Sequence, residues 1–236
     1  MPLTAVTPQA LAPRDRATVA ALAAALPARP IHHHVAKRLL DLTGATALLL
    51  LTLPVLLVAG LAIALDSRGP VVFTQERVGL HGRTFRLHKL RTMTHGNDEA
   101  QRVAFARLVV SGVAVPDCGL YKLARDSRIT RSGRVLRRFS LDELPQLWNV
   151  LRGDMSLVGP RPAVAHEVAL YDEHALRRLH VKPGLTGPWQ VGGRAQLSFV
   201  EMIALDLDYG RQWSVGTDVR ILLRTPWAAL AGRGAA

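Results

Sequence analysis

The hydrophobic pattern of the chain is dominated by one uncharged apolar run at residues 42–65. Its length is typical of a membrane helix, which needs about 20 apolar residues to cross the hydrocarbon core. Charged residues bound the run on both sides, namely Lys37, Arg38 and Asp41 before it and Asp66 and Arg68 after it. No later run approaches this length, so the sequence predicts one membrane segment at residues 35–67 and a water-facing domain at residues 68–236.

Pro54 lies at the centre of the apolar run. A proline inside a helix removes a backbone hydrogen bond and favours a kink. Basic residues lie on both sides of the run, so the positive-inside rule selects no orientation. A helix that enters the membrane, breaks at Pro54 and leaves by the same cytoplasmic face satisfies both flanks. We therefore favour a re-entrant helix and keep a straight span as the alternative. A signal peptide is disfavoured, because a long segment precedes the run.

Residues 1–34 are rich in Ala and Pro, and no helical stripe continues through the prolines. We expect a flexible tail there. The histidine run His32, His33 and His34 could bind a metal loosely. No carboxylate or cysteine lies at ligand spacing from the run, which favours a solvated patch instead.

Beyond the membrane segment, the pattern predicts a mainly helical α+β domain. Two short alternating segments, at residues 71–74 and 84–90, predict a small β-hairpin that presents Lys89. A short strand is expected at residues 155–158 and a long loop, rich in Gly and Pro, at residues 183–193. Helices are expected at residues 100–110, 144–151, 164–180, 198–209 and 218–230.

The chain is strongly basic, since its 236 residues carry Lys+Arg 30 against Asp+Glu 18, a formal net charge of +12. Such a protein attracts an anionic partner, which is nucleic acid, anionic lipid or a phosphorylated substrate. Few aromatic residues (5%) and no recognition motif weigh against nucleic acid. Anionic lipid headgroups would hold the domain on a membrane surface. The single cysteine, Cys118, rules out an internal disulfide framework and a cysteine-based zinc site.

Two adjacent carboxylates, Asp142 and Glu143, follow a strongly basic segment. Adjacent residues on a helix do not face each other, so the pair converges only where the backbone turns, as at a helix start. Ser140 and Glu143 also have the spacing of a capping box, in which the acids would only support the helix N-terminus. Pro145 makes that helix start irregular. Spacing alone leaves a catalytic and a capping interpretation open.

Arg161 lies between Pro160 and Pro162, which restrict the backbone on both sides. An arginine held in this way is a preorganised anion clamp, although the segment could also be a rigid surface turn. The Gly-rich segment that ends in Arg194 allows close backbone approach to a ligand, or contains turns only. A carboxylate can attack phosphorus where cations disperse the phosphate charge. A Mg²⁺ ion on the neighbouring carboxylate would do this best.

Several long motifs together resemble the bacterial sugar transferase family, the monotopic polyprenyl-phosphate phosphoglycosyl transferases. The resemblance covers the chain from about residue 35 to its C-terminal end. Its motifs are KRLLD at 37–41, FTQERVG at 73–79, KLRTM at 89–93, RITR at 128–131, the segments 140–149 and 153–162, and KPGLTG to QVGGR at 182–194. The chain departs from the family pattern by Leu53 before Pro54, where serine is often found, and by a longer segment after Met93.

The resemblance implies a reaction in two steps. Asp142 would attack the β-phosphate of a UDP-sugar, release UMP and carry the phosphosugar. A polyprenyl phosphate, with undecaprenyl phosphate as the expected lipid, would then accept it in the first membrane step of exopolysaccharide, O-antigen or glycan synthesis. Glu143 would hold Mg²⁺. The remaining family positions are basic residues expected near phosphates, Lys89, Arg137 and Arg161, and two further residues of the substrate-binding pattern, Arg194 and Asp218.

The resemblance also implies a location at the bacterial inner membrane, with the catalytic domain on the cytoplasmic face. The re-entrant helix with Pro54 is a family feature. Larger members carry a further N-terminal membrane region, so we expect a minimal catalytic form. The expected partners are a UDP-sugar, a polyprenyl phosphate and anionic lipids, without nucleic acid, and a homodimer is possible. A membrane-anchored nucleic-acid-binding module and a non-catalytic scaffold are the competing functions.

Overall fold

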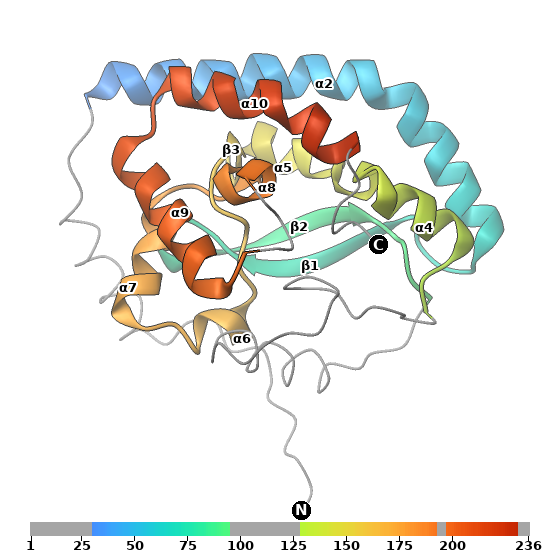
Figure 1. Cartoon of the computed structure of the whole chain (residues 1–236). Helices are drawn as coiled ribbons and strands as arrows, with labels where there is room; N and C mark the ends of the chain where they lie inside the picture. The colour runs from blue at the N-terminus through green and yellow to red at the C-terminus, as the bar shows by residue number, and fades with distance from the viewer. Residues whose placement is uncertain (1–29, 95–127, 193–196, 231–236) are drawn as a thin grey trace, which may run out of the picture.

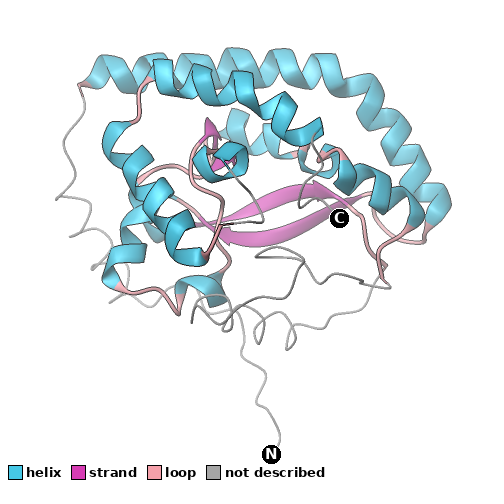
Figure 2. Cartoon of the chain, in the orientation of Figure 1, coloured by secondary structure: helices cyan, strands magenta, loops and turns pink. Residues whose placement is uncertain are grey.

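The computed structural model describes residues 30–94, 128–192 and 197–230. These residues form a mainly helical structure with two small two-stranded sheets (Figure 2). The predicted fold class, mainly helical with a small hairpin, is therefore confirmed. Most of the tail expected at residues 1–34, namely residues 1–29, and the helix expected at residues 100–110 lie outside the described residues. The tail is wrong for residues 31–34, which form the first turn of a long helix.

The longest helix, α2 (Ile31–Asp66), contains the whole apolar run. Its length and apolar composition would allow it to cross a membrane, which holds for no other helix among the described residues. Figure 1 shows α2 along one side of the molecule, with a bend in its C-terminal half. Pro54 lies in that half, within a helix that is continuous from end to end. The helix thus begins slightly before residue 35 and bends without being interrupted.

One face of α2 packs against the domain. Its buried residues repeat at every fourth position near each end of the helix, which places them on one face: Lys37, Asp41, Ala45, Ala59 and Ile63. Large apolar side chains on the other faces are exposed, among them Leu50, Leu51, Leu57, Val58 and Leu61. An exposed apolar surface of this kind is typical of contact with lipid.

Both ends of α2 are hydrogen-bonded to the rest of the domain. Near the start, Arg38 donates to two carbonyl groups at the C-terminal end of α5 (Gln146–Arg152), at 2.7 and 2.8 Å. At the end, the Asp66 carboxylate accepts from the amide and the hydroxyl of Ser132, at 2.8 and 2.7 Å, at the start of α4 (Arg131–Arg138). The apolar helix is therefore fixed along the domain at two points.

The predicted hairpin is present as β1 (Val72–Val78) and β2 (Thr84–Leu90), which pair antiparallel. The first strand extends beyond the predicted residue 74. Paired and alternate residues of an antiparallel ladder share a face, so the register places Arg77 and Lys89 on the same face. This shared face carries two of the cations that surround the candidate site.

A second pair of strands, β3 (Ser156–Val158) and β4 (Gly184–Thr186), is parallel and lies in the core. The backbones approach so closely that a Cβ on Gly184 would overlap the amide nitrogen of Gly159, and only glycine fits there. The proline-flanked Arg161 follows soon after β3, so the sheet fixes the start of that segment. The surrounding core contains Leu147, Val150, Met155 and Leu157.

The helix expected at residues 164–180 is wrong as a single element. Asp172 starts a new helix inside this range, because its carboxylate accepts a hydrogen bond from the amide of Ala175 at 2.7 Å. The range contains α6 (Ala165–Val168), α7 (Glu173–Leu176) and the 3₁₀ helix η3 (Arg177–His180).

The C-terminal part of the described chain is helical. α9 (Phe199–Gln212) and α10 (Val215–Leu230) confirm the last two predicted helices, and α10 lies beside α2 in Figure 1. The loop expected at residues 183–193 is wrong in part, because it contains β4 and the short helix α8 (Pro188–Gly192). β4 forms by pairing with a distant strand, which a local pattern of Gly and Pro does not reveal.

Candidate active site

The acidic pair lies on a single tight turn, the 3₁₀ helix η2 (Leu141–Glu143). Ser140 precedes it with φ of 56°, a left-handed conformation that residues other than glycine rarely adopt. Its side chain makes no capping hydrogen bond, so the capping-box interpretation is wrong. Asp142 is 9% exposed, whereas the Glu143 side chain is 39% exposed. The turn thus places two adjacent carboxylates in different surroundings, and backbone strain of this kind often accompanies a functional site.

Lys89 of β2 forms an ion pair with the acidic turn. Its Nζ donates to Oε1 of Glu143 at 2.8 Å, and the two side chains are 22% and 39% exposed. An ion pair with this much solvent contact contributes little to stability. The effect of this ion pair is therefore to fix one carboxylate oxygen of Glu143 against the hairpin.

Arg137 approaches the same turn from α4. Its Nε donates to Oγ1 of Thr92, just beyond β2, at 2.9 Å. The amide of Ser140, at the start of the turn, donates to the Arg137 carbonyl at 3.1 Å. Arg137 is therefore fixed between the end of the hairpin and the acidic turn.

Arg77 links the acidic turn to the segment around Arg161. Arg77 is 8% exposed, and its Nη1 donates to the carbonyl of Pro162 at 2.9 Å. Burial, followed by the positive charge of Arg161, lowers the pKa of Arg77 to about 10, while Glu167 and Glu143 act in the opposite direction. Arg77 thus lies within electrostatic range of both Arg161 and Glu143. The sequence shows Arg77 in a family motif, but nothing local distinguishes it from a surface arginine.

Arg161 lies at the other end of this group. Its Nη1 is 4.0 Å from Oε1 of Glu167, and its side chain is 25% exposed. The carbonyl groups around it are hydrogen-bonded to buried donors, so the backbone is held as the flanking prolines predict. Lys89 thus contacts Glu143, Arg77 contacts the backbone next to Arg161, and the charges of Glu143 and Arg161 both act on the pKa of Arg77.

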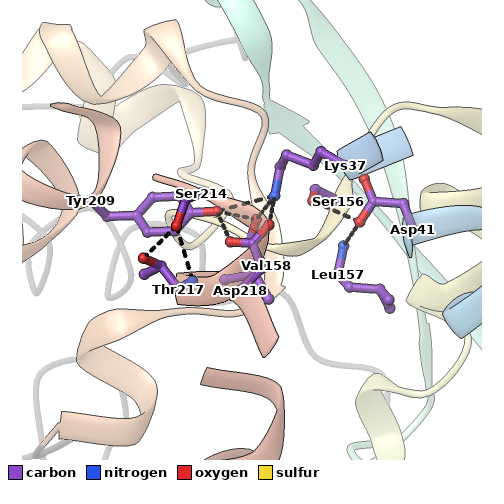
Figure 3. Close-up of polar contacts among 9 residues, drawn as sticks. All are labelled: Lys37, Asp41, Ser156, Leu157, Val158, Tyr209, Ser214, Thr217 and Asp218. Atoms are coloured by element: carbon purple, nitrogen blue, oxygen red, sulfur yellow. Dashed lines mark hydrogen bonds and ion pairs between the residues drawn. The ribbon is translucent and has the colours of Figure 1, made fainter. Parts of the chain in front are cut away.

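Asp218 lies in a different place, shown in Figure 3. Its carboxylate is fully buried and pairs with Lys37 of α2, whose Nζ is 2.5 Å from Oδ2. The hydroxyl of Tyr209 donates to Oδ1 at 2.7 Å. The ammonium group also donates to the carbonyl of Val158 at 3.1 Å, so the cluster joins α2, α9, α10 and the end of β3. Burial raises the pKa of Asp218, and the positive charge of Lys37 opposes this shift.

The acidic turn and the Asp218 cluster lie at opposite ends of α2. Leu141, next to Asp142, packs on the apolar cluster that contains Ile63. Lys37 and Ile63 are separated by roughly 39 Å of helix at a rise of about 1.5 Å per residue. The structure therefore does not bring Asp218 beside the acidic pair, and its contacts are those of a structural ion pair. Arg194 lies outside the described residues.

The geometry of this group suits a phosphorylated substrate. Within the described residues, no three His, Cys, Asp or Glu side chains are placed to hold a metal ion by themselves. Mg²⁺, however, is commonly bound by one or two carboxylates together with substrate phosphates. Asp142 and Glu143 supply that donor set, because they are adjacent and Glu143 is partly exposed. The residues present therefore fit a Mg²⁺ ion that arrives with a phosphorylated substrate.

Comparison with known proteins gives a consistent assignment. The family model described as "Bacterial sugar transferase" matches residues 32–232. A protein from Caulobacter vibrioides named UDP-glucose:undecaprenyl-phosphate glucose-1-phosphate transferase is 47% identical over 198 residues, which cover 80% of this chain and 67% of that protein. The Exopolysaccharide production protein ExoY of Rhizobium meliloti is 39% identical over 201 residues, which cover 85% of this chain and 88% of ExoY.

The relatives differ in length. Galactosyl transferase CpsE of Streptococcus agalactiae is 41% identical over 204 residues, 86% of this chain but only 44% of CpsE. The chain thus spans less than half of CpsE and most of ExoY. The matched region contains the acidic turn and all of α2 except its first residue, Ile31.

Proposed function

The chain belongs to the bacterial sugar transferase family, and we propose that it transfers a phosphosugar from a UDP-sugar to a polyprenyl phosphate, with release of UMP. Relatives named for glucose or galactose transfer, one of them to undecaprenyl phosphate, support this substrate class. The observation that carries the proposal is the buried Asp142 on a strained turn beside the Lys89–Glu143 pair. The product would be a polyprenyl-diphosphate sugar for exopolysaccharide synthesis.

The proposed first step is attack by a carboxylate oxygen of Asp142 on the β-phosphorus of the UDP-sugar. The bond between that phosphorus and the oxygen bridging it to the α-phosphate breaks, and UMP leaves with the bridging oxygen. In the second step, a phosphate oxygen of the polyprenyl phosphate attacks the same phosphorus and releases the Asp142 carboxylate. A nucleophile regenerated in this way divides one difficult displacement into two easier ones.

The cations around the turn have separate parts in this reaction. Arg161 and Arg77 would neutralise the diphosphate and disperse the negative charge that repels an anionic nucleophile. Lys89 holds one oxygen of Glu143 and so fixes the position of that carboxylate. Arg137, which is hydrogen-bonded to Thr92 just beyond β2, would act on the leaving phosphate.

Glu143, with the adjacent Asp142, would hold Mg²⁺. When bound, the ion would neutralise charge on the diphosphate. Glu143 is partly exposed, so its carboxylate can be reached by an ion that arrives with the substrate. Glu143→Gln should therefore weaken the dependence of activity on Mg²⁺ concentration more than it changes the fold.

We propose further that α2 is re-entrant, with the domain at the cytoplasmic face of the inner membrane. The support is that Arg38 near its start and Asp66 at its end both hydrogen-bond to the same water-facing domain. A straight span would place these ends on opposite sides of the bilayer and break one set of contacts. Cysteines placed at the exposed positions His32 and Arg68, in a Cys118→Ser background, test this. A membrane-impermeant thiol reagent should label both from one side, and labelling from opposite sides would overturn the proposal.

The transfer reaction is tested by UMP release from the purified protein. The assay contains Mg²⁺, polyprenyl phosphate and a panel of UDP-sugars. Asp142→Asn should abolish release, while Asp208→Asn, an exposed carboxylate on α9, should leave it within about twofold of wild type. No release by the folded wild-type protein with any sugar of the panel, or full activity of Asp142→Asn, would contradict the proposal.

A further inference from the structure

The backbone of residues 158–162 is held by three cationic side chains from distant parts of the chain. Lys37 donates to the carbonyl of Val158 at 3.1 Å, and Arg77 donates to the carbonyl of Pro162 at 2.9 Å. The third donor is Arg178, whose Nη2 donates to the carbonyl of Arg161 at 3.1 Å. All three donors are less than 9% exposed. Such donors leave the segment little freedom to move.

Arg178 is itself fixed by two partners. Its Nη2 also donates to Oδ2 of Asp206 at 2.6 Å, and its Nη1 donates to the hydroxyl of Tyr171 at 2.7 Å. Arg178 is 3% exposed and Asp206 is fully buried. Contacts from α9 and from the segment before α7 therefore fix the guanidinium plane, and an N–H of its Nη2 donates to the Arg161 carbonyl.

A buried ion pair is a costly way to stabilise a fold, because an apolar pair of similar volume does so equally well. An apolar pair, however, could not donate to the Arg161 carbonyl. The arginine that receives this hydrogen bond is the one that the proposed function assigns to the phosphates. The position of the Arg178–Asp206 pair is thus better explained by its hydrogen bond to the Arg161 carbonyl than by the stability that the pair adds.

We propose that Arg178, fixed by Asp206 and Tyr171, is a positioning residue that holds the Arg161 peptide so that the Arg161 guanidinium is presented to the phosphates of the donor sugar nucleotide. This inference rests on the proposed function. Arg178 itself does not touch substrate and acts through Arg161. Its removal would let the segment relax, and a displacement of about 1 Å in a catalytic group can cost on the order of 100-fold in rate.

The test is a double-variant cycle on UMP release with Arg178→Met and Arg161→Met. Arg178→Met should lower kcat/KM by roughly 10- to 100-fold. If Arg178 acts through Arg161, adding Arg178→Met to Arg161→Met should change the rate by less than about twofold. Effects that multiply in the double variant would overturn the proposal. Arg152→Met, which removes an exposed arginine 3.5 Å from Asp154, is the matched control and should leave the rate unchanged.

A second measurement does not depend on activity or on the tolerance of Arg178→Met. Tyr171→Phe removes a single hydroxyl that anchors Arg178. Amide hydrogen exchange should become faster at Gly159 and Gly184, whose amides bond to Thr186 and Pro160 across the held segment, and should not change in α5. Unchanged exchange at both glycines would contradict the positioning role.

The outcomes separate the two proposals. If the wild-type protein releases no UMP, the proposed function fails, and exchange alone decides whether Arg178 holds the segment. If the wild type is active but the Arg178 and Arg161 effects multiply, only the positioning role fails.

Discussion

Removing the charge of Asp218 should destabilise the protein strongly, because its partner Lys37 would remain buried. Lys37 places its three ammonium protons on Asp218, on the Tyr209 hydroxyl and on the Val158 carbonyl. The side chains of the pair are 10% and 1% exposed, so water cannot replace the carboxylate. Breaking a buried pair from one side costs about 3–5 kcal/mol. We therefore predict a large loss of stability for Asp218→Asn, a change that keeps the shape of the side chain.

A loss of about 3–5 kcal/mol corresponds to a decrease in Tm of roughly 6–20 °C for a chain of this size.

The assay is thermal unfolding in detergent micelles, followed by circular dichroism. The control is the double variant Lys37→Met/Asp218→Leu, in which no charge is left unpaired. Tyr209 can then turn its hydroxyl to the Val158 carbonyl, which lies 3.0 Å away. The double variant should therefore recover most of the lost Tm. The reasoning is refuted if Asp218→Asn melts within about 2 °C of wild type, or if the double variant melts no higher than the single one.

Three further predictions concern other parts of the structure. Lys89→Met should lower UMP release by at least about 10-fold. It should shift Tm little, because its partner Glu143 is 39% exposed and such ion pairs contribute about 0–1 kcal/mol to stability. A large fall in Tm would contradict this prediction. Burial, followed by nearby positive charge, lowers the pKa of His180 to about 4, so the folded state binds fewer protons than the unfolded state between pH 6.5 and pH 4. The stability linked to His180 is therefore complete above pH 6.5 and is lost as the pH falls, and His180→Leu should lose less Tm than wild type between pH 7.5 and pH 5. Gly184→Ala should prevent normal pairing of β3 with β4, because its Cβ would overlap the Gly159 amide, and a wild-type melting curve for this variant would refute the predicted contact.

The elements that the sequence predicts correctly are those set by local periodicity. The apolar run gives α2, alternation gives the hairpin, and amphipathic spacing gives α9 and α10. The errors arise where a distant contact or a single cap decides the structure. Asp172 restarts the helix within residues 164–180, and β4 exists only because it pairs with β3.

The candidate site likewise contains residues that local sequence reveals and residues whose roles depend on distant contacts. Asp142, Glu143 and Arg161 are recognisable from motifs, because their neighbours in sequence are unusual. The roles of the buried cations depend on contacts that no local pattern contains. Lys37 and Asp218 are 181 positions apart in the chain. Arg177 and Arg178 are adjacent, and only the fold decides that Arg178 is the one that holds the Arg161 carbonyl.

The most direct test of the account is intact-protein mass spectrometry after incubation with a UDP-sugar and Mg²⁺ in the absence of polyprenyl phosphate. The account predicts a mass increase of one phosphosugar that maps to Asp142, disappears when polyprenyl phosphate is added, and is absent in Asp142→Asn. Turnover by the wild-type protein without any such adduct, under conditions that trap the first step, would contradict the covalent mechanism.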